Sequence, residues 1–596
     1  MIPSPPEAPG TADPTRAPAC ALAIRDAFAD YNRRFGDITR RARRHFESND
    51  WNAARADAVA RIELYDRCVH EISEALAGHL GDQAQDRGLW TAVRDRYAQL
   101  IAPLLDQELY KTFFNTLTRR FFKTRGVAPD IEFVALDIEP TDRITHPVSR
   151  FGYAVSGDLA ATARRLLGDY PFALPYADLE GDAAAVAAAL QARWNPGGDD
   201  ELLAIELLDT VFYRERRAYL VGRVFGRERY APCVIALVND GQSLRVDAVL
   251  LTRHHVAVLF GYTHSYFHAD LATVGDAVVF LRTLLPGKPV DEIYTVLGRA
   301  KQGKTERYRH FFSHLAAHPG QRLVHADGER GMVMAVFTLP SYALVFKIIR
   351  DEFGFPKDSV REDVRNKYSL VFKHDRVGRL IDAQEYRHLR FPRAQFEAGL
   401  LDELLRECRE SVSADGEDIV VHHCYVERRV RPLNLYVKEV DEATALAAVL
   451  DYGQAIKDLA RSNIFPGDLL LKNFGATRHG RAIFYDYDEL CLVGDCRFRR
   501  LPEPRNDEEE MHHGAWYYVA ENDVFPEQFP RFLGMSPAQR EALLQAHGEI
   551  FDVEWWQALQ AELRAGRQAD VPPYPDSARL PAGPGGAPSA SARTNG

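Results

Sequence analysis

The fold of this chain is decided by Ser462-Asn-Ile-Phe-Pro-Gly-Asp468-Leu-Leu-Leu-Lys472-Asn473 and, further along, by Ile483-Phe-Tyr-Asp486-Tyr-Asp488. The first stretch reads as a polar loop, and the second as a strand that ends in carboxylates. Phosphoryl transfer needs one carboxylate to orient the hydroxyl nucleophile, and an amide oxygen and a second carboxylate to hold Mg²⁺. Asp468, Asn473 and Asp486 supply these groups in the order and spacing of a protein-kinase catalytic loop and its D-F-G partner.

The consensus residues around these three positions are missing. Pro466-Gly467-Asp468 stands where kinases have His-Arg-Asp, and Asp486-Tyr487-Asp488 stands where they have D-F-G. The alternative is a surface loop and a strand that hold three common polar residues by coincidence. Other parts of the chain decide between these interpretations.

Length and composition limit the answer. At 596 residues the chain exceeds the usual size of one hydrophobic core, so we expect two or more domains. A net charge of −11 argues against a dedicated nucleic-acid binder. Seven cysteines without a C-x-x-C pair indicate neither a disulfide framework nor a zinc ribbon, and they fit a reducing compartment. Because neither a secretory signal nor a membrane-spanning apolar run is found, we expect a cytoplasmic protein with no membrane partner.

The first half of the chain is predicted to be mainly helical with a β-sheet portion. Residues 1–20 and 571–596 are rich in Pro, Gly, Ala and Ser, and we expect both to be disordered tails. Helices are expected over 21–125 and again over 275–315. An apolar stripe at helical spacing is formed by Ile62, Tyr65, Val69, Ile72 and Leu76. Strands are predicted at Ile131–Leu136, Tyr219–Phe225, Cys233–Val238, Val246–Leu251 and Val256–Tyr262.

A phosphate-loop pattern falls in the later helical region. The segment Gly298-Arg-Ala-Lys-Gln-Gly303-Lys304-Thr305 satisfies the bare frame G-x-x-x-x-G-K-[ST]. A true Walker A loop follows a parallel strand, whereas Pro289–Leu297 reads as a helix. The pattern is therefore a weak alternative nucleotide site.

A second domain is expected from residue 319, opening with a strand, a glycine loop and two further strands. Leu323-Val324-His325 is followed by Ala326-Asp-Gly328-Glu-Arg-Gly331-Met-Val, and then by strands at Met334–Thr338 and Leu344–Ile349. Compared with G-x-G-x-x-G-x-V, only the first glycine is replaced, by Ala326. Glycines in such a loop let backbone N–H groups approach nucleotide phosphates closely.

Lys347 lies in the last of these strands, between Phe346 and Ile348. Kinases place a lysine here to reach the α- and β-phosphates. A lysine in a buried strand is costly unless it is paired, and the alternative is an edge strand whose lysine faces solvent. The sequence leaves three candidates for the paired glutamate, namely Glu352, Glu362 and Glu385.

The elements that follow agree with a kinase. Ile419–Val426 predicts a strand that enters an interlobe hinge, where adenine would bind backbone groups. A helix leading into the Asp468 loop is indicated by the apolar positions Leu446, Val449, Leu450, Gly453, Ile456 and Ala460. We therefore predict an α+β protein with a mainly helical regulatory domain at 21–318 and a bilobal protein-kinase-like domain at 319–570.

The chain resembles the isocitrate dehydrogenase kinase/phosphatase family over about residues 21–570. The resemblance rests on long segments, which are Leu285-Pro-Gly-Lys-Pro-Val-Asp-Glu-Ile-Tyr-Thr-Val-Leu-Gly, Gly331-Met-Val-Met, His374-Asp-Arg-Val-Gly-Arg, Asp451-Tyr-Gly-Gln-Ala-Ile-Lys-Asp-Leu-Ala, Asn463-Ile-Phe-Pro-Gly-Asp and Phe484-Tyr-Asp-Tyr-Asp-Glu. It implies a bifunctional enzyme that phosphorylates a serine of isocitrate dehydrogenase and removes the same phosphate. That activity would direct isocitrate between the citric acid cycle and the glyoxylate bypass.

The resemblance also implies cofactors and site residues. These are ATP and ADP with Mg²⁺ (or Mn²⁺ as the alternative metal), and AMP as an allosteric effector whose site no motif locates. By matching position, the catalytic residues are Asp468 and, for the phosphatase direction, Asp382, while the metal ligands are Asn473 and Asp486. The nucleotide-binding residues are Ala326, Asp327, Gly328, Glu329, Arg330, Gly331, Met332 and Lys347.

Two phosphatase motifs compete with this interpretation. The segment Cys491-Leu-Val-Gly494-Asp-Cys-Arg497 fits the C-x₂-G-x₂-R outline of a cysteine phosphatase, which needs a thiol of lowered pKa at a helix N-terminus. Asp486-Tyr-Asp488 imitates the nucleophilic D-x-D of haloacid-dehalogenase-type phosphatases, although the parallel βαβ pattern is absent. The favoured hypothesis is one nucleotide site that runs in both directions, with Asp382 assisting removal of phosphate.

A pseudokinase scaffold that binds nucleotide without chemistry is the alternative of a different class. The replaced glycine and the altered consensus residues favour it, whereas the three residues needed for chemistry argue against it. The sequence does not fix the oligomeric state, and a homodimer is one arrangement that it leaves open.

Overall fold

The computed structural model describes residues 16–134, 148–194, 201–261, 266–354, 360–374, 376–502, 518–520, 522–567 and 569–581. The chain divides into two compact units. The first unit takes the described residues up to 261, then 266–310 and those from 574 onward, and the second unit takes 311–573. Within the described part of the chain, no helix has the length and apolar character needed to cross a membrane.

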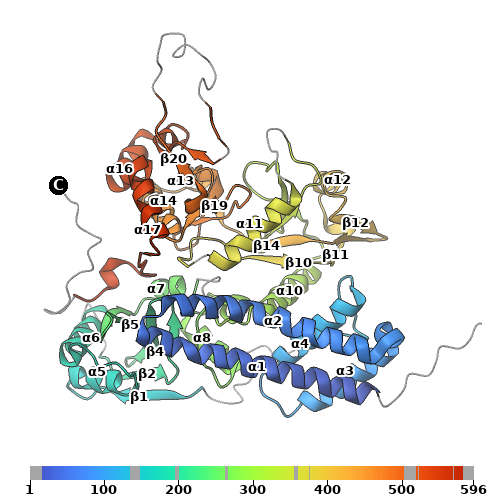
Figure 1. Ribbon diagram of the computed structural model, residues 1–596, viewed down its shortest axis with the longest axis horizontal. Helices are drawn as coiled ribbons and strands as arrows, with labels where there is room; N and C mark the ends of the chain where they lie inside the picture. Colours follow the sequence, from blue (N-terminus) through green and yellow to red (C-terminus); the bar gives the residue numbers. More distant parts are fainter. Residues whose placement is uncertain are drawn as a thin grey trace, which may run out of the picture. The chain divides into compact units, whose positions relative to one another are not determined.

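The first unit begins with long helices, which Figure 1 shows in blue. They are α1 (Arg16–Ser48), α2 (Trp51–Leu80), α3 (Arg87–Ile101) and α4 (Gln107–Phe122), with the 3₁₀ turn η1 (Gly81–Gln85) after α2. The Asp50 side chain accepts from the Ala53 N–H and caps α2, and Asp86 caps α3 in the same way through the Leu89 N–H. Four members of the predicted apolar stripe are buried, which are Tyr65, Val69, Ile72 and Leu76.

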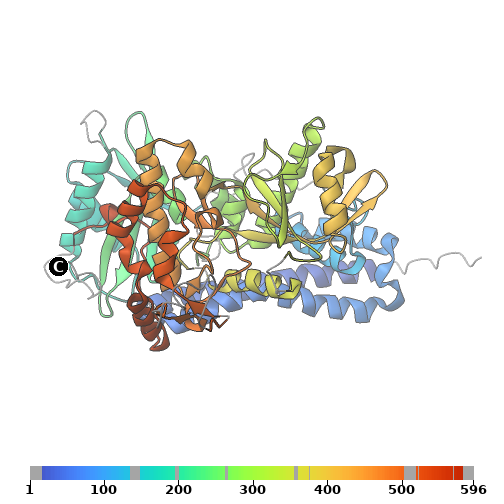
Figure 2. The same cartoon turned by 90° about the horizontal axis from the view of Figure 1, so that it is seen from above.

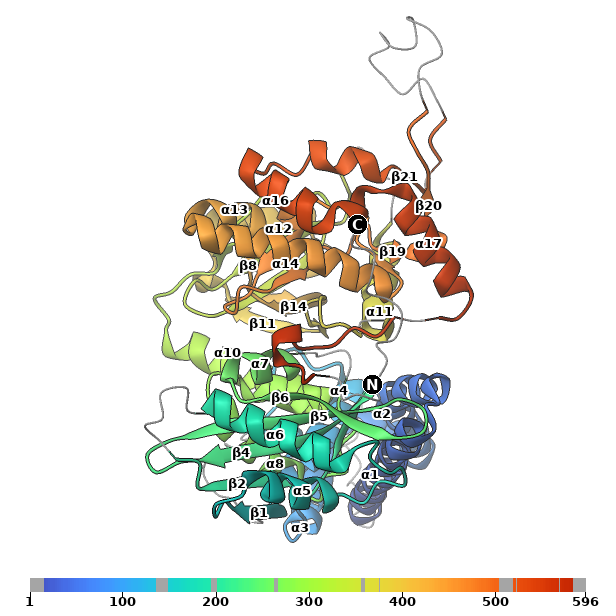
Figure 3. The ribbon, with the colours of Figure 1, turned by 90° about the vertical axis from the view of Figure 1, so that its left-hand side faces the viewer.

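An antiparallel sheet follows, in the order β1-β2-β4-β5-β6, with β3 paired to β4. Alternate residues of β4 point to opposite faces, so Leu220 joins the core that contains α5 and α6 while Tyr219 and Val221 join the core that contains α8 (Val274–Leu284). Figure 3 shows α5 and α6 against this sheet. The bounds are β1 Arg150–Ala154, β2 Ala204–Leu208, β3 Phe212–Arg214, β4 Arg217–Phe225, β5 Tyr230–Asn239, β6 Leu244–Leu250, α5 Leu159–Gly168 and α6 Leu179–Trp194.

Two predicted strands of this unit are wrong. The run predicted at Val256–Tyr262 is the helix α7 (Arg253–Leu259), because Thr252 caps it at the His255 N–H, and Tyr262 lies outside the described residues. In the run predicted at Ile131–Leu136, residues 131–134 form a turn and coil, and the last two lie outside the described part. The later helices are α8 Val274–Leu284, α9 Val290–Val296 and α10 Ala300–Ala317.

The residues of the phosphate-loop pattern form a contact between two helices. Gly303 lies inside α10, and a Cβ there would be 2.3 Å from Thr295 Oγ1 and 2.5 Å from the Asp291 carbonyl oxygen. The glycine therefore lets α9 and α10 approach closely. A helical backbone has its N–H groups bonded within the helix, so this segment cannot cradle phosphates as a Walker A loop does.

The predicted disordered tails are too long. Residues 16–20 belong to α1, with Ala17 and Cys20 buried. At the other end the Tyr574 hydroxyl donates to Asp247 Oδ2 (2.6 Å), and the 3₁₀ turn η7 (Asp576–Ala578) follows. The Pro- and Ala-rich composition of the tails wrongly predicts disorder for these segments. A few apolar side chains are enough to hold a short segment against a folded core. Residues 1–15 and 582–596 lie outside the described part.

The second unit opens with a sheet of antiparallel pairs in the order β10-β14-β9-β8-β7. Its strands are β7 Val324–His325, β8 Met334–Thr338, β9 Leu344–Ile349, β10 Ala383–Tyr386 and β14 Cys424–Arg428, and the helix α11 (Arg361–His374) follows β9. The strand predicted at Ile419–Val426 is in fact split between β13 and β14, which belong to different sheets. The segment inserted between β10 and β14 contains β11 Leu389–Pro392, η2 Arg393–Gln395, α12 Ala398–Glu407, β12 Val412–Asp415 and β13 Asp418–Val421.

The rest of the second unit is built around α14 (Glu442–Arg461), which Asp441 caps. A Cβ at Gly453 would lie 2.4 Å from His547 Cδ2, so the glycine permits the close crossing of α14 and α16 seen in Figure 2. The other helices are α13 Leu433–Glu439, η3 Leu471–Asn473, η4 Val493–Asp495, η5 Pro526–Arg531, α16 Pro537–His547, η6 Gly548–Phe551 and α17 Val553–Arg564. The short strands are β15 Arg431–Pro432, β16 Ile464–Phe465, β17 Phe474–Ala476, β18 Ala482–Phe484, β19 Cys491–Leu492, β20 Arg497–Phe498 and β21 Asp523–Val524. The predicted α+β fold class is confirmed.

Candidate active site

Lys347 lies in the middle of the sheet and is buried, so the interpretation as an edge-strand lysine facing solvent is wrong. Its Nζ forms an ion pair with Glu427 Oε2 (2.8 Å) and donates to the Tyr485 carbonyl oxygen (2.7 Å). Glu427 stands on β14, opposite Val345, and is therefore the diagonal neighbour of Lys347 across the strand pair.

The three glutamates that the sequence offered as partners of Lys347 are not its partner. Glu385 forms a hydrogen bond with His423, which with Arg387 lowers the pKa of Glu385 to about 2. The α11 helix, where a kinase would supply the glutamate, contributes Lys367 instead, whose Nζ donates to the Asp488 carbonyl oxygen (2.6 Å). A cross-strand partner was missed because strand register cannot be read from local sequence.

Glu427 is a buried carboxylate in contact with a buried ammonium. Burial raises the pKa of Glu427, and Lys347 acts against that shift. The Asp382 carboxylate raises the same pKa through its negative charge, which places Asp382 in the electrostatic environment of this pair.

The catalytic loop runs from β16 through Gly467 and Asp468 to η3 and β17. Asp468 Oδ1 accepts from the Leu470 N–H (3.2 Å) and from the side-chain amide of Asn473. Gly467 has φ +89°, and a Cβ there would lie 2.5 Å from the Glu489 Cβ, so the turn before Asp468 requires glycine. Burial first, and then the negative charge of Glu489, raise the pKa of Asp468.

A single residue joins the catalytic loop to Lys347. The Tyr485 N–H donates to the Asn473 carbonyl oxygen (3.1 Å), while the Tyr485 carbonyl oxygen accepts from Lys347 Nζ. Asp486 is the next residue. Of the three positions predicted for phosphoryl transfer, Asp468 and Asn473 are in direct contact, and Asp486 feels the charges of both Asp468 and Lys347.

Asp486 has the environment expected of a cation ligand. Burial, followed by the neighbouring Asp488 carboxylate, raises the pKa of Asp486 to about 7. A divalent cation would relieve this repulsion. Asp486 and the amide oxygen of Asn473 are the hard oxygen donors that Mg²⁺ prefers, together with waters and phosphates. Among the described residues, no three His, Cys, Asp or Glu side chains gather into a group that could hold a metal ion by itself.

The glycine loop lies between β7 and β8 and contacts the catalytic loop. The Ala326 N–H donates to the Val336 carbonyl oxygen (3.0 Å) where the loop begins. Glu329 forms an ion pair with Lys472 (3.0 Å), which directly precedes Asn473. Gly328 has φ +118°, a conformation that favours glycine. At the loop's other side, Asp327 pairs with Arg431 (2.7 Å).

Asp382 follows a segment that is fastened to β18. The Phe484 N–H donates to the Arg379 carbonyl oxygen (2.8 Å), and the Ile381 N–H donates to the Phe484 carbonyl oxygen (3.1 Å). The Tyr487 hydroxyl also donates to the Ile381 carbonyl oxygen (2.6 Å). Ile381, directly before Asp382, therefore bonds residues that precede and follow Asp486 in the sequence.

The buried Arg379 guanidinium anchors this segment to α14. It bonds the Asp451 carboxylate (2.7 Å) and the Asp458 carboxylate (2.8 Å), and it donates to the Ala482 carbonyl oxygen (3.1 Å). The role of Arg379 was not predicted from the sequence. The available signal was the pair Asp451 and Asp458, which lie seven residues apart on one predicted helix and so could share a cation.

Neither competing phosphatase motif forms its site. Cys491 Sγ lies 3.5 Å from Cys496 Sγ, and the exposed Arg497 side chain pairs with Asp523 (3.5 Å). The described residues of this segment form the 3₁₀ turn η4 (Val493–Asp495) and then enter the strand β20 at Arg497, so no α-helix begins after Cys491 as the motif requires. The D-x-D pattern follows β18, which pairs antiparallel with β17, whereas the haloacid-dehalogenase arrangement requires a parallel strand.

Comparison with known proteins finds similar sequences over most of the chain. Residues 321–576 match the model described as "Isocitrate dehydrogenase kinase/phosphatase (AceK) kinase domain", and residues 21–319 match the corresponding regulatory domain. The chain is 59% identical over 566 residues to the isocitrate dehydrogenase kinase/phosphatase of Xanthomonas axonopodis pv. citri (strain 306), covering 95% of this chain and 98% of the relative. It is 47% identical over 567 residues to the enzyme of the same name from Anaeromyxobacter sp. (strain Fw109-5), with the same coverage.

Proposed function

Because the chain belongs to the isocitrate dehydrogenase kinase/phosphatase family, we propose that it phosphorylates a serine of isocitrate dehydrogenase and removes that phosphate at one nucleotide–Mg²⁺ site. The observation that carries the proposal is the pair of backbone bonds of Tyr485, which join Lys347 to the loop of Asp468 and Asn473. Nucleotide use follows from the kinase domain. We infer that the phosphates lie between the glycine loop, Lys347 and Asp486.

In the kinase direction, Asp468 orients the serine hydroxyl and accepts its proton as the phosphoryl group moves. Its position is set by the Leu470 N–H and the Asn473 amide. Lys347, itself oriented by Glu427, neutralises charge on the α- and β-phosphates. Mg²⁺ (or Mn²⁺), held by Asn473 and Asp486, would neutralise charge on the phosphate oxygens. Most of the rate enhancement then comes from positioning and electrostatics.

In the phosphatase direction, we infer that the same nucleotide site accepts the phosphoryl group from phosphoserine onto ADP, or releases it to water. We propose that Asp382 assists the removal of phosphate. Its support is the fastening of residues 379–381 to β18, two residues before Asp486, and the failure of both separate phosphatase motifs. Control of flux between the citric acid cycle and the glyoxylate bypass would follow from switching isocitrate dehydrogenase.

A four-protein comparison tests this assignment. Wild type, Asp382→Asn, Asp468→Asn and Asp486→Asn are assayed with labelled ATP and isocitrate dehydrogenase, and with phosphorylated isocitrate dehydrogenase and ADP. We expect Asp486→Asn to lose both activities and Asp382→Asn to lose mainly the phosphatase. Asp382→Asn with normal phosphatase turnover, beside an Asp468→Asn that loses only the kinase, would contradict a shared site.

The same assays address the remaining proposals. AMP is our proposed allosteric effector, and its addition should change the ratio of the two rates. A scaffold without chemistry, which the replaced consensus residues favour, would show no labelled product with wild type. We also propose a cytoplasmic location, because seven cysteines without a C-x-x-C pair fit a reducing compartment.

A further inference from the structure

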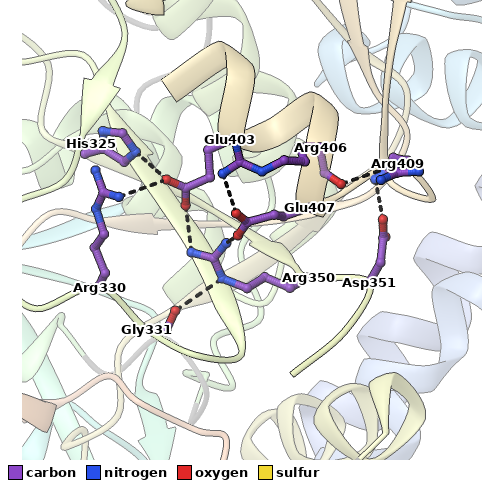
Figure 4. Close-up of polar contacts among 9 residues, drawn as sticks. All are labelled: His325, Arg330, Gly331, Arg350, Asp351, Glu403, Arg406, Glu407 and Arg409. Carbon is purple, nitrogen blue, oxygen red and sulfur yellow. Dashed lines mark hydrogen bonds and ion pairs between the residues drawn. The ribbon is translucent and has the colours of Figure 1, made fainter. Parts of the chain in front are cut away.

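Arg350 follows the last residue of β9, three positions after Lys347, and its buried guanidinium points to the glycine loop (Figure 4). Nε donates to the carbonyl oxygen of Gly331 in that loop (3.2 Å). Nη2 bonds Glu403 (2.7 Å), and Nη1 bonds Glu407. The Arg350 N–H also donates to the Val333 carbonyl oxygen (3.0 Å), just after the loop.

Glu403 holds several parts of the loop at once. It stands on α12, in the segment inserted between β10 and β14, and its side chain is buried. Its carboxylate forms a hydrogen bond with His325 Nε2 (2.9 Å), directly before the loop, and an ion pair with Arg330 (3.5 Å) inside it. The Arg350 and His325 contacts outweigh burial and lower the pKa of Glu403, so the carboxylate is ionised at neutral pH.

We propose that Arg350 and Glu403 are positioning residues for nucleotide, forming a clamp that holds the glycine loop in shape before phosphates arrive. The clamp consists of His325, Arg330, the Gly331 carbonyl, Arg350 and Glu403. A mobile loop must be ordered when it closes on phosphates, and this ordering weakens binding. Charge-assisted bonds to both ends of the loop reduce that cost, and they make α12 a brace for the nucleotide site.

The neighbouring Glu407 provides a matched control. It also bonds Arg350, and it lies one helical turn after Glu403 on α12. Its side chain is 38% exposed, however, and it also pairs with Arg406 on the same helix. Removal of the Glu407 charge therefore leaves in place the bonds of Arg350 to Glu403 and Gly331, and those of Glu403 to His325 and Arg330.

The experiment compares full-length wild type with Glu403→Gln, Arg350→Lys and Glu407→Gln. Steady-state kinase assays with isocitrate dehydrogenase give kcat and the KM values for ATP and for the protein substrate, and calorimetry gives the Kd for ADP with Mg²⁺. For Glu403→Gln and Arg350→Lys we expect the Kd and the KM for ATP to rise about tenfold. The kcat at saturating ATP and the KM for protein substrate should stay within about twofold, and Glu407→Gln should resemble wild type.

Hydrogen exchange of the loop amides, measured without nucleotide, gives a second readout. In the two clamp variants, residues 326–332 should exchange faster than in wild type, while β9 keeps its protection. Unchanged nucleotide affinity together with unchanged loop exchange overturns the clamp. A uniform loss of protection, kcat and protein-substrate affinity also overturns it, because that result indicates a purely structural role.

The clamp rests on the proposed nucleotide site, and a further variant separates the two claims. Lys347→Met should weaken ADP binding strongly if nucleotide binds as proposed. If Lys347→Met leaves the Kd unchanged, the nucleotide site is wrongly placed. If Lys347→Met weakens binding while Glu403→Gln and Arg350→Lys do not, the nucleotide site stands and the clamp fails.

Discussion

At the scale of single residues, the site depends on the buried ion pair between Lys347 and Glu427, which orients the lysine ammonium. Each partner is buried, so removal of one charge leaves the other without compensation. Here the carboxylate comes from the neighbouring strand rather than from the helix after β9. The lysine is thus oriented by a neighbouring strand of its own sheet.

Substitution Glu427→Gln should lower both kinase and phosphatase rates about 10- to 100-fold, because the ammonium loses its charged partner. The matched control is Glu385→Gln on β10, whose carboxylate bonds His423 and Arg387 instead. Both variants are compared by labelled-phosphate transfer in each direction. Equal rates for the two variants would show that Glu427 does not orient Lys347.

Gly467 offers a second test at this scale. Gly467→Ala should destabilise the catalytic loop by about 1–3 kcal/mol and reduce turnover, because the new Cβ meets the Glu489 backbone and φ is +89°. Gly480→Ala is the control, since Gly480 also has a positive φ (+72°) but no atom within 4 Å of the added Cβ. Thermal melting and kinase turnover should separate the two variants, and a milder effect at Gly467 would contradict the steric argument.

Site residues differ in how far the sequence predicts them. Asp468, Asn473 and Asp486 are readable from spacing, because the chemistry fixes their order along one short loop and one strand. Glu427 is not readable, because its role depends on the register of β14 against β9. Arg350 and Glu403 are missed for a similar reason, since α12 reaches the loop from an inserted segment that no kinase motif describes.

At the scale of elements, the strands of the second unit were predicted well where alternation and turns are strong. The predicted bounds Met334–Thr338 and Leu344–Ile349 are those of β8 and β9. The errors arise where a local cap or a short break overrides propensity. Thr252 starts a helix in a β-branched run, and His422-His423 separates two strands that read as one.

Arg379 is the residue that holds one such element in place, the segment leading to Asp382. Arg379→Gln should destabilise the second unit by about 3 kcal/mol, because the Asp451 and Asp458 carboxylates lose their shared cation. Asp458 is buried, so water does not replace the lost partner. Calorimetry of the variant measures the loss. Arg481→Gln is the charge-matched control. Arg481 is half-buried and close to Asp451, and its substitution should lower the free energy of unfolding by less.

At the scale of the whole molecule, the chain returns to its first unit after completing the second. Residues 574–581 belong to the first unit, and Tyr574 and Arg579 contact Asp247. Arg217 completes this buried cluster (3.4 Å to Asp247). The prediction of disorder here used the average composition of a 26-residue tail. The packing of its first residues depends on only a few side chains, such as Tyr574 and Arg579.

This cluster gives the first unit a defined response to acid. Burial opposes ionisation of Asp247, but Arg217, Tyr574 and Arg579 prevail and lower its pKa to about 2. Because the folded-state pKa is lowered, the cluster contributes stability above about pH 4, and this contribution, about 2 kcal/mol, is lost as pH falls toward 2. The melting temperature of Asp247→Asn should therefore approach that of wild type as pH falls from 5 to 3.

The control for the acid response is Asp576→Asn, at a highly exposed carboxylate that pairs loosely with Arg579 (3.6 Å). It should melt close to wild type at every pH. A gap between Asp247→Asn and wild type that stays constant from pH 7 to pH 3 would contradict the assignment of the acid response to this cluster.

The central claim is that one nucleotide site serves both reactions, and Lys347→Met tests it most directly. Single-turnover rates are measured with labelled ATP and isocitrate dehydrogenase, and with labelled phospho-isocitrate dehydrogenase and ADP. Our account predicts that both rates fall together, by about 100-fold. Loss of phosphorylation with dephosphorylation at the wild-type rate would contradict it.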